Sequence, residues 1–421
     1  MHLRSLSALI LLALPASASA APAAPKASLT EGEAKALAVE VSAAVESLRG
    51  LKFKRPVAVK LVDDAAARKH FQKRLEKFWP PEEAALEQKA QAQLGLLPPG
   101  TDVVQSLLDL LEEQAGGYYD PSSDTFFILT DMPKAAASIL FAHELTHALD
   151  DQHFDLDARL MAAVEDDDRG TTVGAVIEGS GMLVMSAYMV REQTAGRLDP
   201  QAMLELAETE AGKAEKLGAA PPLMQRLLLA PYMLGLSFLT RGNPLAIARG
   251  VPADDVNRVF AEPPLSTEQL LHPEKYWDEA TRDTPQTIDL PDLSAQIGVG
   301  WKRRLSGVLG ELSLAVITGA PAADPRSLDA HNWTSKGAQG WDGDRYHYYE
   351  GPSGGSATVL ATVWDSPQEA VEFEASLVAA APKVRLRRGS HVVLVGATDG
   401  VPAAKLAAAA LDAVVPPPVK K

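Results

Sequence analysis

The chain has 421 residues, enough at roughly 100–200 residues per domain for two or three domains with a buried core. A hydrophobic content of 46% and a charged content of 23% are those of an ordinary globular protein and exclude a wholly disordered or collagen-like chain. The net charge of -15 argues against a nucleic-acid partner, because an acidic surface repels phosphates. The sequence has no cysteine, so any metal must be held by His, Asp or Glu.

The first 20 residues have the pattern of a secretory signal peptide. His2 and Arg4 form a short basic start, residues 6–14 are apolar, and Ala18-Ser19-Ala20 is an A-x-A-type cleavage site. Residues 21–28 are rich in Ala and Pro and are expected to form a tether. We therefore expect a secreted or periplasmic protein.

Two later windows, residues 176–190 and 227–239, are the most apolar of the remaining chain. Glu178 and two glycines interrupt the first window, and Pro231 interrupts the second. Neither has the uninterrupted run of about 20 apolar residues that a membrane-spanning helix needs. We expect no membrane span in the mature chain.

Periodicity and turn residues predict the elements of the first part of the chain. In chain order they are a helix over 30–49, a short β-rich run over 56–62, helices between 64 and 94, a helix over 103–113 and a strand, turn and strand over 118–129. Residues 133–320 are predicted to be mostly helical.

Beyond residue 325 the pattern changes to a mixture of strands and helices. The expected elements are strands at 346–350, 357–364 and 391–397, and helices at 369–380 and 403–415. The fold class is therefore predicted to be α+β. A mostly helical catalytic domain with a small preceding β-sheet spans residues 29–320, and a small C-terminal α+β domain spans residues 325–421.

The segment His143-Glu144-Leu145-Thr146-His147 has the sequence H-E-x-x-H. On a helix, residues four positions apart lie on one face, so both imidazoles can bind one metal ion while Glu144 stands beside the water on that ion. This spacing is typical of zinc hydrolases. We predict a Zn²⁺ site that includes His143 and His147, with Glu144 as the general base.

A catalytic zinc site usually has three protein ligands, and two residues are candidates for the third. His153 gives the segment the length of H-E-x-x-H-x-x-G-x-x-H, but Asp150 replaces the glycine that lets the chain turn back to the metal. Glu178 lies in an otherwise apolar helix, where burial of an unpaired carboxylate is costly unless a metal compensates it. Its helical neighbours are small and allow another helix to approach: Gly174, Ala175 and Gly181. We favour Glu178 and retain His153 as the alternative.

These motifs resemble the gluzincin metallopeptidases, in which a Glu from a following helix joins H-E-x-x-H. More narrowly, His143–Gln152 and Glu178-Gly179 are similar to a poorly characterised family of secreted bacterial and archaeal proteins that read H-E-L-T-H-A-L-x-D-Q and then E-G. The similarity continues at Gly117–Pro121, Pro263–Tyr276 and Gly340–Arg345. The sequence departs from that pattern at Asp150, where Gln is usual, and at Ser180-Gly181, where Asp-Ala is expected.

The resemblance implies a zincin-like fold and hydrolysis of peptide bonds by a metal-activated water, with a peptide or protein as substrate. It also implies that the strand around Phe126–Leu129 lines the cleft and pairs with the substrate backbone. A thermolysin-like Asp is absent because position 182 is Met, so Asp150 or Asp151 is expected to orient His143. The candidate donors to the oxyanion are Tyr232, His272 and Tyr276.

A second hypothesis is a zinc-binding protein without hydrolytic activity that acts in binding or assembly at the cell envelope. Glu144 favours the enzyme, since a scaffold has no need of a carboxylate beside the metal. The acidic run Glu165–Asp168 is interpreted as a solvated loop, because it lacks the ligand spacing of an EF-hand calcium site.

Overall fold

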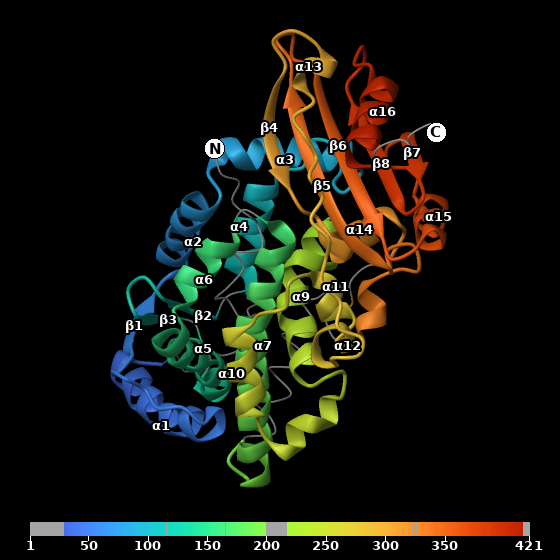
Figure 1. Cartoon of the computed structure of the whole chain (residues 1–421). Coiled ribbons are helices and arrows are strands. Elements are labelled where there is room, and N and C mark those ends of the chain that lie inside the picture. Colours follow the sequence, from blue (N-terminus) through green and yellow to red (C-terminus); the bar gives the residue numbers. More distant parts are fainter. Residues whose placement is uncertain are drawn as a thin grey trace.

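The computed structural model shows an α+β protein that is mostly helical, as the sequence predicts (Figure 1). The structure describes residues 29–114, 116–130, 132, 134–164, 166–198, 217–321, 324 and 327–415. The predicted signal peptide and tether, and Glu165, lie outside these residues.

The first elements match the predicted order. They are α1 (Glu31–Arg49), β1 (Ala58–Val62), α2 (Asp64–Phe78), α3 (Pro81–Gln93), α4 (Val103–Gln114), β2 (Gly117–Asp120) and β3 (Thr125–Leu129). Helix α1 begins at a capping box in which Thr30 accepts a hydrogen bond from the Glu33 amide and the Glu33 carboxylate accepts one from the Thr30 amide. Its buried apolar stripe, which includes Val41 and Val45, faces the core.

The small sheet has the strand order β1-β3-β2. Strand β3 pairs in parallel with β1 and antiparallel with β2. Both edges of β3 are therefore occupied, and the prediction that Phe126–Leu129 pairs with a substrate backbone is wrong. The edges of this sheet are β1 and β2.

The central part is helical. It consists of α5 (Lys134–Phe154), α6 (Leu156–Ala163), α7 (Asp167–Thr194), α9 (Pro222–Leu239), η2 (Pro244–Arg249), α10 (Ala253–Ala261), α11 (Thr267–Leu271), α12 (Glu274–Trp277), α13 (Ser294–Ile297), α14 (Gly310–Ile317) and η3 (Ala330–Trp333). Helix α7 runs through the middle of this part and packs against both α5 and α9 (Figure 1).

Close packing of α7 on α9 depends on small residues. A Cβ atom added to Gly179 would lie 2.6 Å from the carbonyl carbon of Gly235, and one added to Gly235 would lie 2.2 Å from the Ala175 carbonyl oxygen. By length and composition α7 is apolar enough to cross a membrane, but 72% of its most apolar window is buried inside the protein. Its packing is that of a core helix.

The C-terminal sheet has the strand order β4-β5-β6-β8-β7, and all its neighbouring strands are antiparallel. Its elements are β4 (Lys302–Gly307), β5 (Trp341–Glu350), β6 (Ser356–Trp364), α15 (Pro367–Ser376), β7 (Val384–Arg388), β8 (His391–Ala397) and α16 (Ala403–Val414). The sequence did not predict β4 or β7. Because β4 belongs to this sheet, the sheet begins inside the range 29–320 that was assigned to the first domain.

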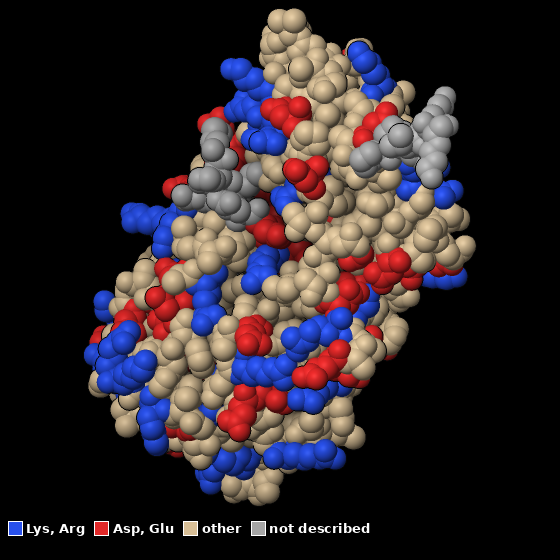
Figure 2. Space-filling model, viewed as in Figure 1, with Lys and Arg blue, Asp and Glu red and all other residues tan. Residues whose placement is uncertain are grey.

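Alternating residues of this sheet face two cores. Val392 and Leu394 belong to the main core, which extends back to Leu29, whereas Val393 and Val395 belong to a second core beneath α16. The main core therefore joins the sheet to the helical part. On the face shown in Figure 2, Lys and Arg side chains lie among Asp and Glu side chains over both parts of the molecule.

Candidate metal centre

The predicted metal ligands meet between two neighbouring helices. His143, Glu144 and His147 lie on α5, and Glu178 lies on α7. All four residues have an exposed fraction of 0%. The structure therefore brings the predicted site residues together in the interior of the helical part.

Glu178 approaches both imidazoles with a single oxygen. Its Oε2 atom lies 3.0 Å from His143 Nε2 and 3.4 Å from His147 Nε2. Two ligands that bind zinc at 2.0–2.1 Å with tetrahedral geometry are about 3.3 Å apart. Each of these two nitrogen–oxygen distances is close to the separation of two zinc ligands, which supports Glu178 as the third ligand.

The approach of α7 to His143 depends on a glycine. A Cβ atom added to Gly181 would lie 2.7 Å from Cε1 of His143 and 2.8 Å from its Nδ1. These distances are shorter than normal van der Waals contact, so only glycine leaves room for the ring. The small residues predicted to let a second helix approach thus include one that touches a ligand directly.

Glu144 is held beside the site by strand β2. Its Oε2 accepts a hydrogen bond of 2.8 Å from the Tyr119 backbone amide. Potential ligand atoms of His143, Glu144 and His147 lie within 4.8 Å of one another. Because Glu178 contacts both ring nitrogens and Glu144 bonds to β2, we assign Glu178 to the ligands and Glu144 to the position of a base.

The charges of the site are strongly coupled. Burial has the largest effect and the neighbouring His147 the second largest, and together they lower the pKa of His143 to about 4. Burial is the largest single effect and opposes the ionised form of Glu178, but the attraction of His147 and His143 and their hydrogen bonds together outweigh it and lower the pKa of Glu178 to about 2. Burial likewise disfavours a charged His147, yet Glu178 raises its pKa above the usual value. The buried carboxylate therefore requires a positive charge beside it.

The donor set fits a zinc ion. Two imidazoles and one carboxylate form the His₂Glu ligand set found in catalytic zinc sites. Among the described residues, buried His147 Nε2 makes no hydrogen bond of normal geometry although Glu178 Oε2 lies 3.4 Å away, as expected for two atoms that bind the same metal ion. A divalent cation at this point would supply the positive charge that Glu178 requires.

Asp150 of α5 forms hydrogen bonds with two neighbouring helices, α1 and α7. Its Oδ1 accepts a hydrogen bond of 2.8 Å from Arg49 Nε of α1, and its Oδ2 accepts one of 2.5 Å from Ser180 Oγ of α7. The neighbouring Asp151 accepts hydrogen bonds from the Tyr119 hydroxyl and the Leu156 amide. Among the described residues, the side-chain partner of His143 is Glu178 and neither aspartate bonds to the His143 ring, so the prediction that Asp150 or Asp151 orients His143 is wrong.

His153 is not part of the centre. Helix α5 continues without a turn through Asp150 to Phe154, so the chain does not swing back to the metal position. The ring of His153 instead lies with its Nε2 2.8 Å from the Lys52 carbonyl oxygen. The structure does not support the three-histidine alternative.

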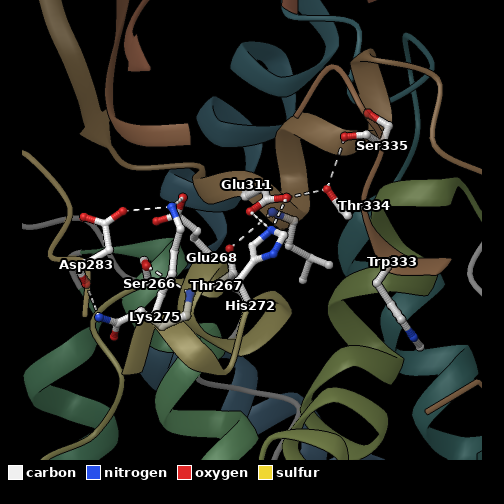
Figure 3. A network of polar contacts seen from close by, with 12 residues as sticks. Ser266, Thr267, Glu268, His272, Lys275, Asp283, Glu311, Trp333, Thr334 and Ser335 are labelled. Atoms are coloured by element: carbon white, nitrogen blue, oxygen red, sulfur yellow. Dashed lines mark hydrogen bonds and ion pairs between the residues drawn. The ribbon is translucent and has the colours of Figure 1, made fainter. Parts of the chain in front are cut away.

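Of the three candidate oxyanion donors, only Tyr232 lies at the centre. Its ring stacks on His143 with a centroid separation of 6.2 Å and an interplanar angle of 22°. His272 belongs to a separate polar network, in which its Nε2 lies 3.1 Å from Glu311 and Thr334 donates to the same carboxylate (Figure 3). The Tyr276 hydroxyl donates to the Glu262 carbonyl oxygen at 2.6 Å.

The acidic run before α7 is not a solvated loop in its described part, so that interpretation is wrong. The Asp166 side chain caps α7 by accepting from the Arg169 amide at 2.9 Å. Asp168 is buried and accepts hydrogen bonds from the Thr267 amide and hydroxyl. These carboxylates begin the helix that carries Glu178.

One family model matches part of the chain. Residues 299–407 match the model described as "Domain of unknown function (DUF8575)". The match runs from just before β4 into α16 and excludes the candidate metal centre. No curated protein and no solved structure matches the chain. These comparisons therefore assign no function to the residues of the centre.

Proposed function

We propose that this protein is a zinc-dependent metallopeptidase in which His143, His147 and Glu178 hold the ion and Glu144 is the general base. The observation that carries the proposal is the position of one Glu178 oxygen, 3.0 Å from His143 Nε2 and 3.4 Å from His147 Nε2. These ligands come from sequence positions with the H-E-x-x-H spacing and from a helix that is otherwise apolar. The proposed location, secreted or periplasmic, follows from the N-terminal sequence.

Each residue has a distinct task in this proposal. A bound zinc ion would lower the pKa of a water molecule and polarise a substrate carbonyl. Glu144, oriented by the Tyr119 amide, accepts the proton of the attacking water and transfers it to the departing amine. Tyr232 keeps the His143 ring in place by stacking on it. Asp150 maintains the distance between α5 and α7 through Ser180.

The burial of the centre supports a second candidate function. Its four principal residues have exposed fractions of 0%, so a peptide reaches them only after the covering elements open. A zinc-binding protein that uses the centre for stability, in binding or assembly at the cell envelope, needs no such opening. The two functions differ in whether Glu144 matters beyond the fold.

The decisive experiment compares the wild-type mature chain with Glu144→Gln. Both proteins are loaded with zinc, their metal content is measured by elemental analysis, and both are incubated with unfolded protein substrates and a peptide library. We expect about one zinc per chain in both proteins, and peptide cleavage only by the wild type, because an amide cannot accept the proton. The expected loss of rate is at least 100-fold.

Three results would contradict part or all of this proposal. Absence of bound zinc in the wild type would remove both candidate functions. Zinc binding without cleavage of any substrate would favour the non-hydrolytic protein. Cleavage by Glu144→Gln at the wild-type rate would show that Glu144 is not the base.

A further inference from the structure

A separate cavity lies on the side of α7 that faces α6 and α10. Its volume is ≈ 240 Å³. Its lining consists of Arg159, Ala162, Ala163, Arg169, Val173, Val176, Ile177, Val259, Phe260 and Pro263. The metal ligands are not among these residues, although Ile177 immediately precedes Glu178.

The walls of the cavity are apolar. Val173, Val176 and Ile177 of α7 and Val259 and Phe260 of α10 have exposed fractions of 6% or less. At the rim, Ala162 is exposed, whereas Arg159, Arg169 and Pro263 are half-buried. The cavity thus has an apolar interior and two arginines at its opening.

Neutral groups hold the first of these arginines. Arg159 donates from Nε to the Phe154 carbonyl oxygen at 2.7 Å and from Nη1 to the Phe260 carbonyl oxygen. Neither acceptor is ionised. Burial lowers the pKa of Arg159, and attraction by Asp155 opposes this effect. An anion at the rim would therefore stabilise the Arg159 charge.

The second arginine is available to a ligand. Within the part of the chain that the structure describes, the Arg169 guanidinium has no hydrogen bond or ion pair, and Asp166 attracts it only through space. No described residue of the cavity lining is acidic. Two positive charges thus border a small apolar space.

We propose that this cavity binds a medium-chain carboxylate, with the alkyl chain between α7 and α10 and the carboxylate at Arg159 and Arg169. Guanidinium groups bind carboxylates with paired hydrogen bonds, which explains the charge of the rim. The apolar walls offer few partners to water, which explains the preference for an alkyl chain. The small volume favours one chain over a two-chain lipid.

Isothermal titration calorimetry of the full mature chain with octanoate, nonanoate and decanoate tests the proposal. We expect one site per chain and an affinity that rises about fourfold for each methylene, as burial of that group predicts. Decanol should bind at least tenfold more weakly than decanoate because it lacks the charge. Decylammonium should not bind measurably.

Two variants locate the site without changing its buried walls. Arg169→Gln should weaken decanoate binding at least tenfold and leave decanol binding unchanged, and Ala162→Trp should block the opening for both. Arg191→Gln is the matched control, since Arg191 lies on the same helix and pairs with Glu192 outside the cavity. Circular dichroism checks that each variant is folded.

The proposal is overturned by any of three outcomes. These are no decanoate binding to the wild type, equal binding of decanoate and decylammonium, and decanoate affinities of Arg169→Gln and Ala162→Trp within twofold of the Arg191→Gln control. Zinc content and peptide cleavage do not enter this test, so its result is separate from that of the proposed enzyme.

Discussion

At Glu178, a carboxylate that cannot reach solvent is stabilised by two imidazoles. A buried ionised group without such partners would cost several kcal/mol of folding free energy. The partners here are the two histidines of H-E-x-x-H, at 3.0 and 3.4 Å. The same residue therefore explains the local electrostatics and completes the proposed set of three zinc ligands.

Substitution of the two competing third ligands distinguishes them. Glu178→Ala removes one of the three proposed ligands and is expected to weaken zinc binding by on the order of 100-fold or more. Loss of a residue that only hydrogen-bonds to a ligand usually has a smaller effect. His153→Ala removes contacts with the Lys52 carbonyl and the Phe154 ring, both outside the centre, and should leave the affinity within about threefold. Competition with a chromogenic chelator measures both affinities.

The opposite order of losses would contradict the assignment of Glu178. Glu178→Gln serves as the control for folding, since its amide keeps the size of the side chain while removing the charge. If Glu178→Gln and wild type are folded but bind zinc equally well, Glu178 is not a ligand.

At the scale of elements, the contact between α5 and α7 sets the geometry of the centre. Gly181 lets the His143 ring lie against the α7 backbone, and Ser180 bonds to Asp150 of α5. On the other side of α7, Gly179 lies against Gly235 of α9. Helix α7 is thus held closely between two partners, and the Glu178 carboxylate has little freedom to move.

Gly181→Ala tests this role of the helix contact. Alanine favours a helix over glycine by about 1 kcal/mol, so the substitution would stabilise an isolated helix. Here the added Cβ would lie 2.7 Å from His143 Cε1, and we expect at least tenfold weaker zinc binding. The matched control is Gly32→Ala on α1, where a Cβ has no atom within 4 Å. Equal zinc affinity of the two variants would show that this contact does not position His143.

Apolar periodicity and residue spacing within short segments were sufficient to predict most helices and strands and the residues of the candidate centre. The H-E-x-x-H spacing and the isolated charge of Glu178 in an apolar stretch of helix predicted four residues that the structure brings together, and their roles as zinc ligands and base stay predictions. The edge strands β4 and β7 were missed because their sequences, KRRLSG and VRLRR, are short and rich in Lys and Arg and contain at most two large apolar residues each.

Contacts between distant parts of the chain could not be predicted in the same way. Asp150 pairs with Arg49, 101 residues away, so its role as a link between helices depends on tertiary packing. The pairing of both edges of β3 likewise depends on the position of β1, which lies more than 60 residues earlier in the chain. Family analogy placed the substrate on β3, and the strand order corrects it.

At the scale of the whole molecule, the helical part and the C-terminal sheet share one core. Buried residues from Leu29 to Leu394 form a continuous cluster, and the Tyr346 hydroxyl of β5 lies 3.5 Å from Asp167 at the start of α7. The sheet therefore contacts the same helix that carries Glu178. The matched family model covers the sheet, and the shared core packs this sheet against the rest of the protein.

Phe373→Ala tests whether this shared core makes the two parts unfold together. Phe373 of α15 has an exposed fraction of 0% and packs on Trp364 with a ring separation of 4.5 Å, within the main core. Truncation of a buried Phe to Ala costs about 3–5 kcal/mol of unfolding free energy. We expect a lower unfolding temperature by far-UV circular dichroism. The temperature of zinc release, followed with a chelator dye, should fall by the same amount.

Leu411→Ala in the second core beneath α16 is the matched comparison. Because that core does not extend to α7, zinc release at the wild-type temperature in Leu411→Ala, but not in Phe373→Ala, would assign the coupling to the main core. Zinc release at the wild-type temperature in both variants would contradict it.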